Sequence, residues 1–284
     1  MQVIEDPKQL RSEIKKLKQQ GEVVGFVPTM GNLHQGHLTL VKEVQQRSNI
    51  SIVSIFVNPM QFNNANDLAN YPKTLSEDCA KLEQAGVDIV FTPNAEVIYP
   101  NGLQSQTFVE VPEMSDCLEG ESRPGHFRGV STIVTKLFNL VQPDIACFGE
   151  KDFQQLSIIK KMVVDLAMPI EIIPVATVRE PSGLAMSSRN SKLTADEKLI
   201  APKIAEVMNN LGKNVQLNSK NSKQLIKDAC QALDESGFKT DEIHVVDPLT
   251  LAPLNTASKQ AVILMAAFLG DTRLIDNVVV DLHL

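Results

Sequence analysis

Two histidines three residues apart are the residues of this sequence whose types and spacing most directly indicate chemistry. His34 and His37 belong to the string Pro-Thr-Met-Gly-Asn-Leu-His-Gln-Gly-His at residues 28–37. The string follows an apolar run and precedes a helical pattern. The start of a helix offers backbone N–H groups to anions, and side chains three residues apart lie on one helix face. The turn therefore predicts a phosphate site in which two imidazoles stabilise negative charge. In the alternative interpretation, both histidines only cap or pack the first helical turn.

Two further runs place polar groups where a polyphosphate could bind. Residues 148–155 read Phe-Gly-Glu-Lys-Asp-Phe-Gln-Gln; here Lys151 supplies a mobile cation, and Asp152 could hold a ribose hydroxyl or a hydrated metal. Residues 186–190, Met-Ser-Ser-Arg-Asn, combine two hydroxyls with the guanidinium of Arg189, which suits phosphate oxygens. Taken alone, the first run would be a solvated helix start and the second an ordinary helix N-cap.

Amide side chains follow a second strand-like run. Asn58 and Gln61 belong to Ser-Ile-Phe-Val-Asn-Pro-Met-Gln-Phe, residues 54–62. Amides both donate and accept hydrogen bonds, which suits a substrate that carries hydroxyls and a carboxylate. For Asn58, the simpler interpretation is that it starts a turn before Pro59.

The elements that must position these residues alternate between strands and helices. Apolar strand-like runs lie at residues 22–27, 50–57, 87–91, 144–148 and 170–175. Helical patterns lie between them, at residues 75–85, 129–141 and 153–166 among others. Such alternation predicts an α/β fold, a Rossmann-like parallel sheet with helices on both faces and a ligand site at the carboxyl ends of its strands.

The pattern changes near residue 177, where we expect a domain boundary. Helical patterns at residues 194–209 and 222–236 are followed by strand-like runs at 242–246, 261–269 and 274–280. These runs predict a smaller C-terminal α+β domain with an antiparallel sheet. We therefore expect the ligand site in a first domain of residues 1–177, and a lid domain of residues 178–284 that carries the 186–190 loop.

Composition excludes several classes of protein. The chain has 27 basic and 34 acidic residues, without the basic excess that nucleic-acid binding requires. Its longest apolar run, Ala261–Leu269, is far shorter than the roughly 20 residues of a membrane-spanning helix. The N-terminus shows no secretory signal, and the four cysteines are scattered without a Cys-x-x-Cys pair. We expect a cytoplasmic protein without a zinc or redox cluster.

Taken together, the motifs resemble those of a known family. His-x-Gly-His after a first strand is similar to the signature of the nucleotidyltransferase superfamily. The longer string at 28–37 resembles the pantothenate synthetase family, and four further matches follow in order at residues 54–62, 123–130, 148–155 and 186–190. The resemblance covers nearly the whole chain, although beyond about Leu193 it is one of general character.

The resemblance implies an enzyme that condenses (R)-pantoate with β-alanine. ATP would first convert pantoate to pantoyl adenylate, with release of pyrophosphate, and β-alanine would then displace AMP to give pantothenate. The implied catalytic residues are His34, His37, Lys151 and Arg189, with His37 as the proton donor. Gln61 and Gln155 would bind pantoate, so the first domain would hold both nucleotide and pantoate. Magnesium would accompany ATP without a metal site built from protein side chains, and the family forms homodimers through the first domain.

The implied ATP contacts come from four segments. They are Met30, Gly31, Asn32, Leu33, His34, Gln35, Gly36 and His37 in the first turn, Gly149, Glu150, Lys151 and Asp152 in the second, Val178 for adenine, and Met186, Ser187, Ser188 and Arg189 over the phosphates.

Some assignments stay open at this level. Arg123, His126 and Arg128 match the family, and lining the pantoate end or closing the site are both possible roles. Two other functions compete with the ligase. A nucleotidyltransferase would release pyrophosphate without AMP, and a non-catalytic regulator would bind ATP without turnover.

Overall fold

The computed structural model describes residues 1–63 and 65–283, and the chain divides into two compact units. The first unit consists of residues 1–150 and 154–176, and the second of residues 151–153 and 177–284. The boundary expected from the sequence kept Lys151 in the first domain, whereas the contacts of Lys151–Phe153 are with the second unit. Among the described residues, no helix combines the length and the apolar character needed to cross a membrane.

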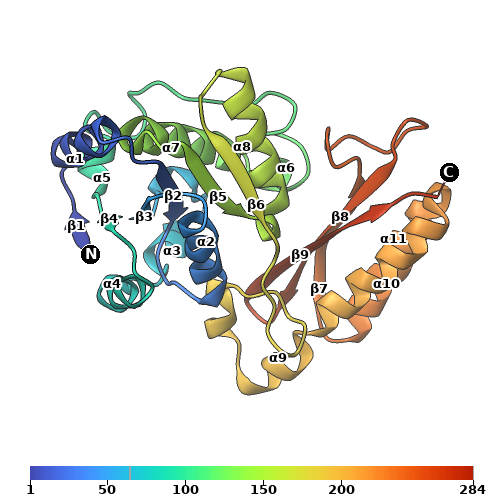
Figure 1. Ribbon diagram of the computed structural model, residues 1–284. Helices are drawn as coiled ribbons and strands as arrows, with labels where there is room; N and C mark the ends of the chain where they lie inside the picture. The colour runs from blue at the N-terminus through green and yellow to red at the C-terminus, as the bar shows by residue number, and fades with distance from the viewer. Residues whose placement is uncertain (64, 284) are drawn as a thin grey trace. The chain divides into compact units, whose positions relative to one another are not determined.

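The first unit is built on a six-stranded parallel sheet (Figure 1). Its strands lie in the order β1-β4-β3-β2-β5-β6. Their bounds are β1 Gln2–Ile4, β2 Val24–Thr29, β3 Ile50–Ile55, β4 Ile89–Phe91, β5 Ile145–Gly149 and β6 Glu171–Val175. The sequence order therefore reverses direction between the neighbours β2 and β5, and the carboxyl ends of strands at such a switch point form a ligand crevice.

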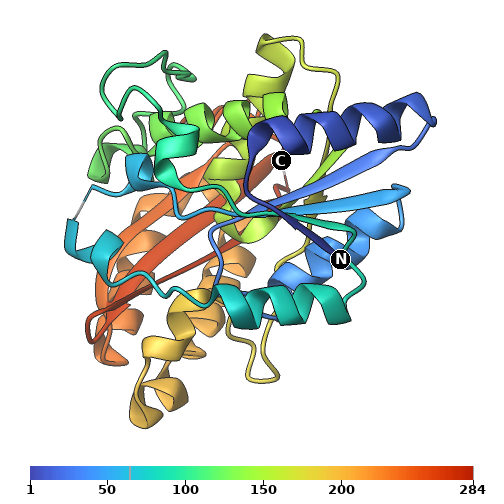
Figure 2. The same ribbon diagram turned by 90° about the vertical axis from the view of Figure 1, so that its left-hand side faces the viewer.

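Helices cover both faces of this sheet. The longer ones are α1 (Pro7–Gln19), α2 (Gln35–Gln45), α4 (Leu75–Gln84), α7 (His126–Val141) and α8 (Phe153–Asp165). The shorter ones are η1 (Pro59–Gln61), α3 (Ala65–Ala69), α5 (Ala95–Ile98), α6 (Glu119–Ser122) and η2 (Glu150–Asp152). Helices α1 and α7 lie on one face, with α2 and α4 on the other (Figure 2). Because both faces are covered, the central strands are mostly apolar and buried, and β2 is buried at five of its six positions.

The second unit combines an antiparallel sheet with two long helices. Its sheet has the order β7-β8-β9, formed by Lys239–Val246, Gln260–Leu269 and Thr272–Asp281. Its helices are α9 (Ala195–Ile200), α10 (Lys203–Leu217) and α11 (Ser222–Glu235), with the short turns η3 (Ser188–Lys192) and η4 (Ser219–Asn221). Helix α10 packs on β8 and β9, and α11 packs on β7.

The predicted fold class is confirmed, with local differences. The edge strand β1 and the helix α1 have no counterpart in the prediction. The single helix expected at 194–209 is two helices, α9 and α10, separated at Pro202. A proline inside a helix lacks the N–H for its hydrogen bond and clashes with the preceding turn, so the chain breaks there.

Candidate active site

The histidine turn lies between the end of β2 and the start of α2, at the switch point of the sheet. His34 is the N-cap of α2, and its Nδ1 accepts the N–H of Gly36 at 3.1 Å. His37 closes the cap in the other direction, because its Nδ1 accepts the N–H of His34 at 3.2 Å. The two ring centroids are 4.1 Å apart. Both histidines therefore cap α2.

Capping also fixes the chemistry of the two rings. A nitrogen that accepts a backbone N–H carries no proton, so each neutral imidazole holds its proton on Nε2. Each ring can then offer an Nε2–H donor to an anion. Protonation at Nδ1 would place two donors against each other and break the cap. With these cap hydrogen bonds in place, the Nε2 side of each ring is the side that can donate a hydrogen bond.

The backbone of this turn is less available to an anion than the sequence predicts. The N–H of Gly31 donates to Thr29 Oγ1 at 3.2 Å, and the N–H groups of Asn32 and Leu33 each donate to the Asp78 carboxylate at 2.8 Å. The imidazoles take two more N–H groups, those of His34 and Gly36. The prediction of a turn with free N–H groups is wrong at these five positions, because internal acceptors already pair them.

The Gln61 amide is oriented by a buried relay of side chains. Gln61 lies in η1 and is 8% exposed. Its Oε1 accepts a hydrogen bond from Asn58 Nδ2 at 2.9 Å, and Asn58 Oδ1 accepts one from the Tyr99 hydroxyl at 2.6 Å. This direction leaves the Gln61 Nε2 group as the donor toward a ligand. Asn58 caps η1 by accepting the Met60 N–H, as the simpler interpretation expects, but it also sets the Gln61 amide.

His126 supports the same segment from α7. Its Nδ1 lies 2.7 Å from the backbone oxygen of Gln61, and its side chain is buried. A carbonyl only accepts, so the His126 ring carries its proton on Nδ1. One turn of α7 comes so close that a Cβ at Gly129 would lie 2.8 Å from the Met60 oxygen and 3.0 Å from the Gln61 Cα. The 123–130 motif therefore positions Gln61.

The two arginines of that motif make other contacts. Arg123 forms an ion pair with Glu119 at 2.7 Å, and the Arg128 guanidinium lies 4.8 Å from the centre of the Phe108 ring. These contacts give both side chains a packing role within the first unit.

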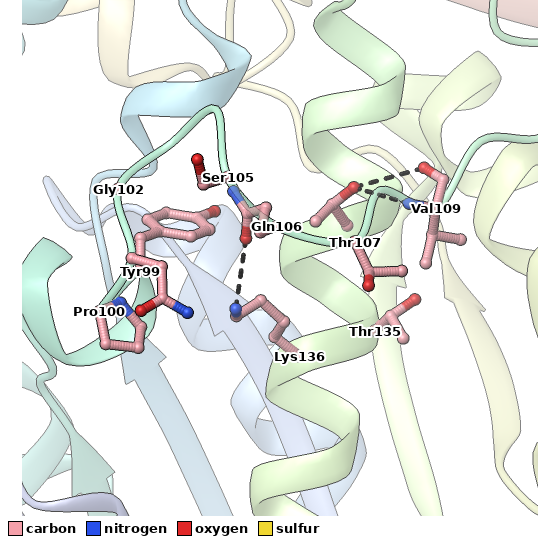
Figure 3. A pocket seen from close by; sticks show the side chains of 11 residues that line it. Tyr99, Pro100, Gly102, Ser105, Gln106, Thr107, Val109, Thr135 and Lys136 are labelled. Carbon is pink, nitrogen blue, oxygen red and sulfur yellow. Dashed lines mark hydrogen bonds between the residues drawn. The ribbon is translucent and has the colours of Figure 1, made fainter.

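Tyr99, the first residue of this chain of hydrogen bonds, also lines a cavity of about 550 Å³ (Figure 3). It lies between α7 and the chain that follows α5, and none of the predicted site residues lines it. Lys136 Nζ lies 3.3 Å from Gln106 Oε1 and 5.1 Å from the centre of the Tyr99 ring. Burial lowers the pKa of Lys136 and raises the pKa of Tyr99. The Tyr99 hydroxyl therefore remains a protonated donor to Asn58 under ordinary conditions.

The run at 148–155 divides between the two units. Gly149 ends β5 beside β2, and a Cβ built on it would meet no atom within 4 Å. Lys151 belongs to the second unit, where its backbone oxygen accepts a hydrogen bond from Asn277 Nδ2 at 2.8 Å. Gln154 is buried and donates to the backbone oxygens of Met114 and Cys117. Gln155, the residue predicted to bind pantoate, is only partly buried.

The other predicted phosphate contacts follow a hairpin in the second unit. Val178 and Met186 are joined by a backbone hydrogen bond of 2.9 Å, and Arg179 pairs with Ala185 as an isolated bridge. The hairpin leads directly into η3, where Ser187 Oγ accepts the N–H of Arg189 at 3.2 Å. This N-cap is the ordinary structural role considered for the motif.

A buried ion pair holds the hairpin on the second sheet. The Arg179 guanidinium donates to both carboxylate oxygens of Asp276, at 2.6 and 2.9 Å, and to the Gly183 oxygen at 3.1 Å. The Asp276 side chain is fully buried, and its hydrogen bond raises the pKa of Arg179. Nothing in the sequence indicated Arg179, Asp276 or Asn277, because each lies in an otherwise ordinary loop or strand.

Comparisons with known proteins all identify one family. The family model described as pantoate-beta-alanine ligase matches residues 2–279. A pantothenate synthetase of Psychromonas ingrahamii is 66% identical over 283 residues, covering 100% of this chain and 98% of that protein. The pantothenate synthetase of Aeromonas hydrophila is 58% identical, covering 99% of each chain.

Solved structures give the same result. The crystal structure of pantothenate synthetase from Thermus thermophilus superposes with a TM-score of 0.85 at 39% identity, covering 98% of this chain and 99% of that one. A pantoate-beta-alanine ligase from Francisella tularensis, complexed with beta-gamma ATP and beta-alanine, gives a TM-score of 0.83 at 38% identity, covering 98% and 97% of the two chains.

Proposed function

This chain belongs to the pantoate-beta-alanine ligase family, and we propose that its reaction proceeds through pantoyl adenylate. The enzyme forms an amide bond between pantoate and β-alanine. A carboxylate resists attack by an amine because oxide is a poor leaving group. ATP removes this obstacle when a pantoate carboxylate oxygen attacks the α-phosphorus and the bond to pyrophosphate breaks. The β-alanine nitrogen then attacks the acyl carbon, AMP leaves with the electron pair of the C–O bond, and the new amide loses a proton.

The observation that carries this proposal is the histidine pair, held with Nε2–H donors at the switch point of the sheet. Negative charge grows on the α-phosphate and on pyrophosphate during the first step. Donors that are fixed before the reaction stabilise such charge without reorganising. We assign His34 and His37 to the phosphates as neutral hydrogen-bond donors. The reaction needs no protein nucleophile.

We also assign two cations of the second unit to the phosphates. In the described part of the chain, neither Lys151 nor Arg189 takes part in an ion pair with a carboxylate. Their charge is therefore not neutralised within the protein, as binding to a polyphosphate requires. Lys151 suits the α-phosphate as a point charge, and Arg189 suits pyrophosphate through its planar fork. The hairpin at Val178 would contact adenine.

Pantoate would bind through the Gln61 and Gln155 amides. The relay from Tyr99 through Asn58 orients the Gln61 Nε2 group as a donor. The hydroxyl and carboxylate oxygens of pantoate can accept hydrogen bonds from this group.

Magnesium would enter with ATP. Within residues 1–63 and 65–283, no group of three or more His, Cys, Asp or Glu side chains is arranged to hold a metal. Mg²⁺ is often bound through substrate phosphates and water, with one or two protein carboxylates. Asp152 is the carboxylate that we assign to its water shell, and the ion would neutralise charge on the leaving pyrophosphate.

We also propose a cytoplasmic homodimer. Four cysteines are unpaired, which suits a reducing compartment. The family resemblance suggests dimerisation through the first unit. Light scattering coupled to size exclusion would measure the mass of the assembly.

One assay tests the proposed reaction against its alternatives. AMP release from ATP is measured with and without pantoate and β-alanine, together with exchange of labelled pyrophosphate into ATP when only pantoate is present. We expect pantoate-dependent exchange, and AMP release that requires both substrates. A nucleotidyltransferase would release pyrophosphate without AMP, and a regulator would bind ATP without either reaction.

A further inference from the structure

A buried carboxylate outside all the sequence motifs contacts the histidine turn. Asp78 lies on α4, 41 residues or more from either histidine, and is 0% exposed. One of its oxygens accepts the N–H of Asn32 and the other accepts the N–H of Leu33, each at 2.8 Å. The Thr74 hydroxyl donates to it at 2.9 Å. A fully buried carboxylate is thus paired by three donors.

The turn that Asp78 holds has an unusual backbone. Gly31 has φ 83° and Asn32 has φ 50°, so two consecutive residues adopt the left-handed conformation. Such residues persist only where the surroundings stabilise them. A Cβ on Gly31 would lie 3.1 Å from the Asp78 carboxylate and 3.2 Å from Ile55 Cγ2. The carboxylate therefore occupies the space inside the turn as well as pairing its N–H groups.

Lys81, one helical turn after Asp78, binds the same segment. Its Nζ donates to the Leu33 oxygen at 2.7 Å and lies 3.9 Å from Asp78 Oδ1. Helix α4 thus pairs both the N–H and the carbonyl of Leu33, the residue immediately before the N-cap His34. The lysine also offsets the negative charge of Asp78 close to the proposed phosphate site.

We propose that Asp78 is a positioning residue for the adenylation step, an inference that rests on the proposed function. By holding the Gly31–Leu33 turn, it fixes the entry of α2 and so the two imidazoles that cap this helix. It also takes up backbone N–H groups that a phosphate would otherwise bind, so phosphates meet the Nε2–H donors of His34 and His37. Asp78 acts through these residues and does not touch the substrate.

The test replaces Asp78 with asparagine. Asp78→Asn keeps the shape of the side chain, but its amide would face one of the two N–H donors, so the turn shifts. Displacement of reacting groups by about 1 Å can lower rates by about a hundredfold. We expect kcat/KM for ATP to fall about tenfold or more, with a weaker ATP Kd by calorimetry. The pantoate KM, governed by Gln61, should stay within about twofold.

Asp88→Asn is the matched control. Asp88 accepts the N–H and the hydroxyl of Ser51, each at 2.8 Å, at the start of β4 and away from the histidine turn. This variant should lose stability without a change in ATP Kd or KM. If Asp78→Asn behaved like Asp88→Asn, with wild-type ATP binding and turnover in a folded protein, the positioning role would be refuted.

Lys81→Met covers the case in which Asp78→Asn does not fold. Lys81 is 42% exposed, so its removal spares the core, while the Leu33 oxygen loses its donor. We expect a change in ATP binding in the same direction as for Asp78→Asn, and unchanged ATP binding would count against the proposal. The ATP Kd can be measured without turnover, so it tests the role of Asp78 independently of the proposed reaction. If the proposed reaction were wrong, the wild type would bind ATP but would not release AMP in a pantoate-dependent manner.

Discussion

Asn277 on β9 donates a hydrogen bond from Nδ2 to the backbone oxygen of Lys151 at 2.8 Å, although the two residues are 126 positions apart. Its neighbour Asp276 holds Arg179 of the hairpin that leads to Arg189. Two consecutive residues of one strand therefore support both segments that carry the proposed cations. This explains why Lys151 belongs to the second unit, while Glu150 and Gln154 on either side belong to the first.

Replacement of Asn277 by alanine should reduce catalysis more than binding of pantoate. Without its donor, the backbone of Lys151 is less fixed, so we expect kcat to fall about tenfold, with about 1 kcal/mol lost in stability for one hydrogen bond. Steady-state kinetics and urea unfolding measure the two effects. Asn139→Ala removes an exposed amide that donates to the Thr135 oxygen, and it should change neither kinetic constant. Equal kinetics in both variants would contradict the role of Asn277.

The second unit should lose more stability when Arg179 is replaced than when the Asp276 carboxylate is replaced. Arg179→Met leaves the fully buried Asp276 without its cation, and we expect about 3 to 5 kcal/mol of lost stability in the second unit. Asp276→Asn keeps a hydrogen-bonding group beside the partly exposed arginine and should cost about 1 to 2 kcal/mol. Hydrogen exchange of β8 and β9 amides reports these losses.

Arg47→Met is the control for that pair. Arg47, just after the end of α2, forms an ion pair with Glu43 of that helix. Its side chain is 47% exposed, and solvent screens such surface pairs so that they contribute little to stability. Equal destabilisation by Arg179→Met and Arg47→Met would show that the buried pair does not hold the hairpin.

Tyr99→Phe should raise the pantoate KM and leave the ATP KM unchanged. The variant removes the hydroxyl that donates to Asn58 Oδ1 at 2.6 Å, the shortest of the hydrogen bonds that orient the Asn58 amide and, through it, the Gln61 amide. We expect a rise of about tenfold, equivalent to about one hydrogen bond of 1.4 kcal/mol. Initial rates at varied pantoate concentration measure the pantoate KM. An equal rise in the KM values of pantoate and ATP would contradict a specific role of Tyr99 in orienting the Gln61 amide.

Tyr99 also sets an expectation for pH. Burial raises the pKa of Tyr99 above the ordinary 10.0, so folding favours the protonated phenol. A raised pKa means that this stability is fully present below pH 10 and is lost as pH rises through the folded pKa. The pantoate KM of wild type should therefore show no Tyr99 titration between neutral pH and about 10. A titration in that range that disappears in Tyr99→Phe would contradict the assignment.

Two variants of His37 separate hydrogen bonding from proton transfer. In His37→Asn the amide oxygen can replace Nδ1 in the cap, so the fold is kept, but the Nε2–H donor is lost. In His37→Gln the amide nitrogen restores a donor near the position of Nε2. If His37 acts as a neutral donor, pyrophosphate exchange should fall about 10² to 10³-fold in His37→Asn and recover in part in His37→Gln. Equal losses would support proton transfer.

The strands and helices that face the site, and the segments that carry its residues, could be predicted from the sequence. Apolar runs such as the one at 22–27 predict strands because a strand covered on both faces must be apolar throughout, and β2 follows that rule. Strand-to-helix turns with glycine, histidine and lysine indicated the carboxyl edge of the sheet, where β2 and β5 lie side by side. These are local properties, set by neighbours within a few residues.

The groups that hold those segments in place, and the chemical state of those groups, could not be predicted from the sequence. Asp78 belongs to a helical pattern that carries no motif, yet it is fully buried and pairs with residues more than 40 positions away. The ring proton of each capping histidine, the direction of the Gln61 amide and the membership of Lys151 in the second unit likewise depend on hydrogen bonds. Periodicity and propensity do not encode such bonds, because they form only when distant elements have packed together.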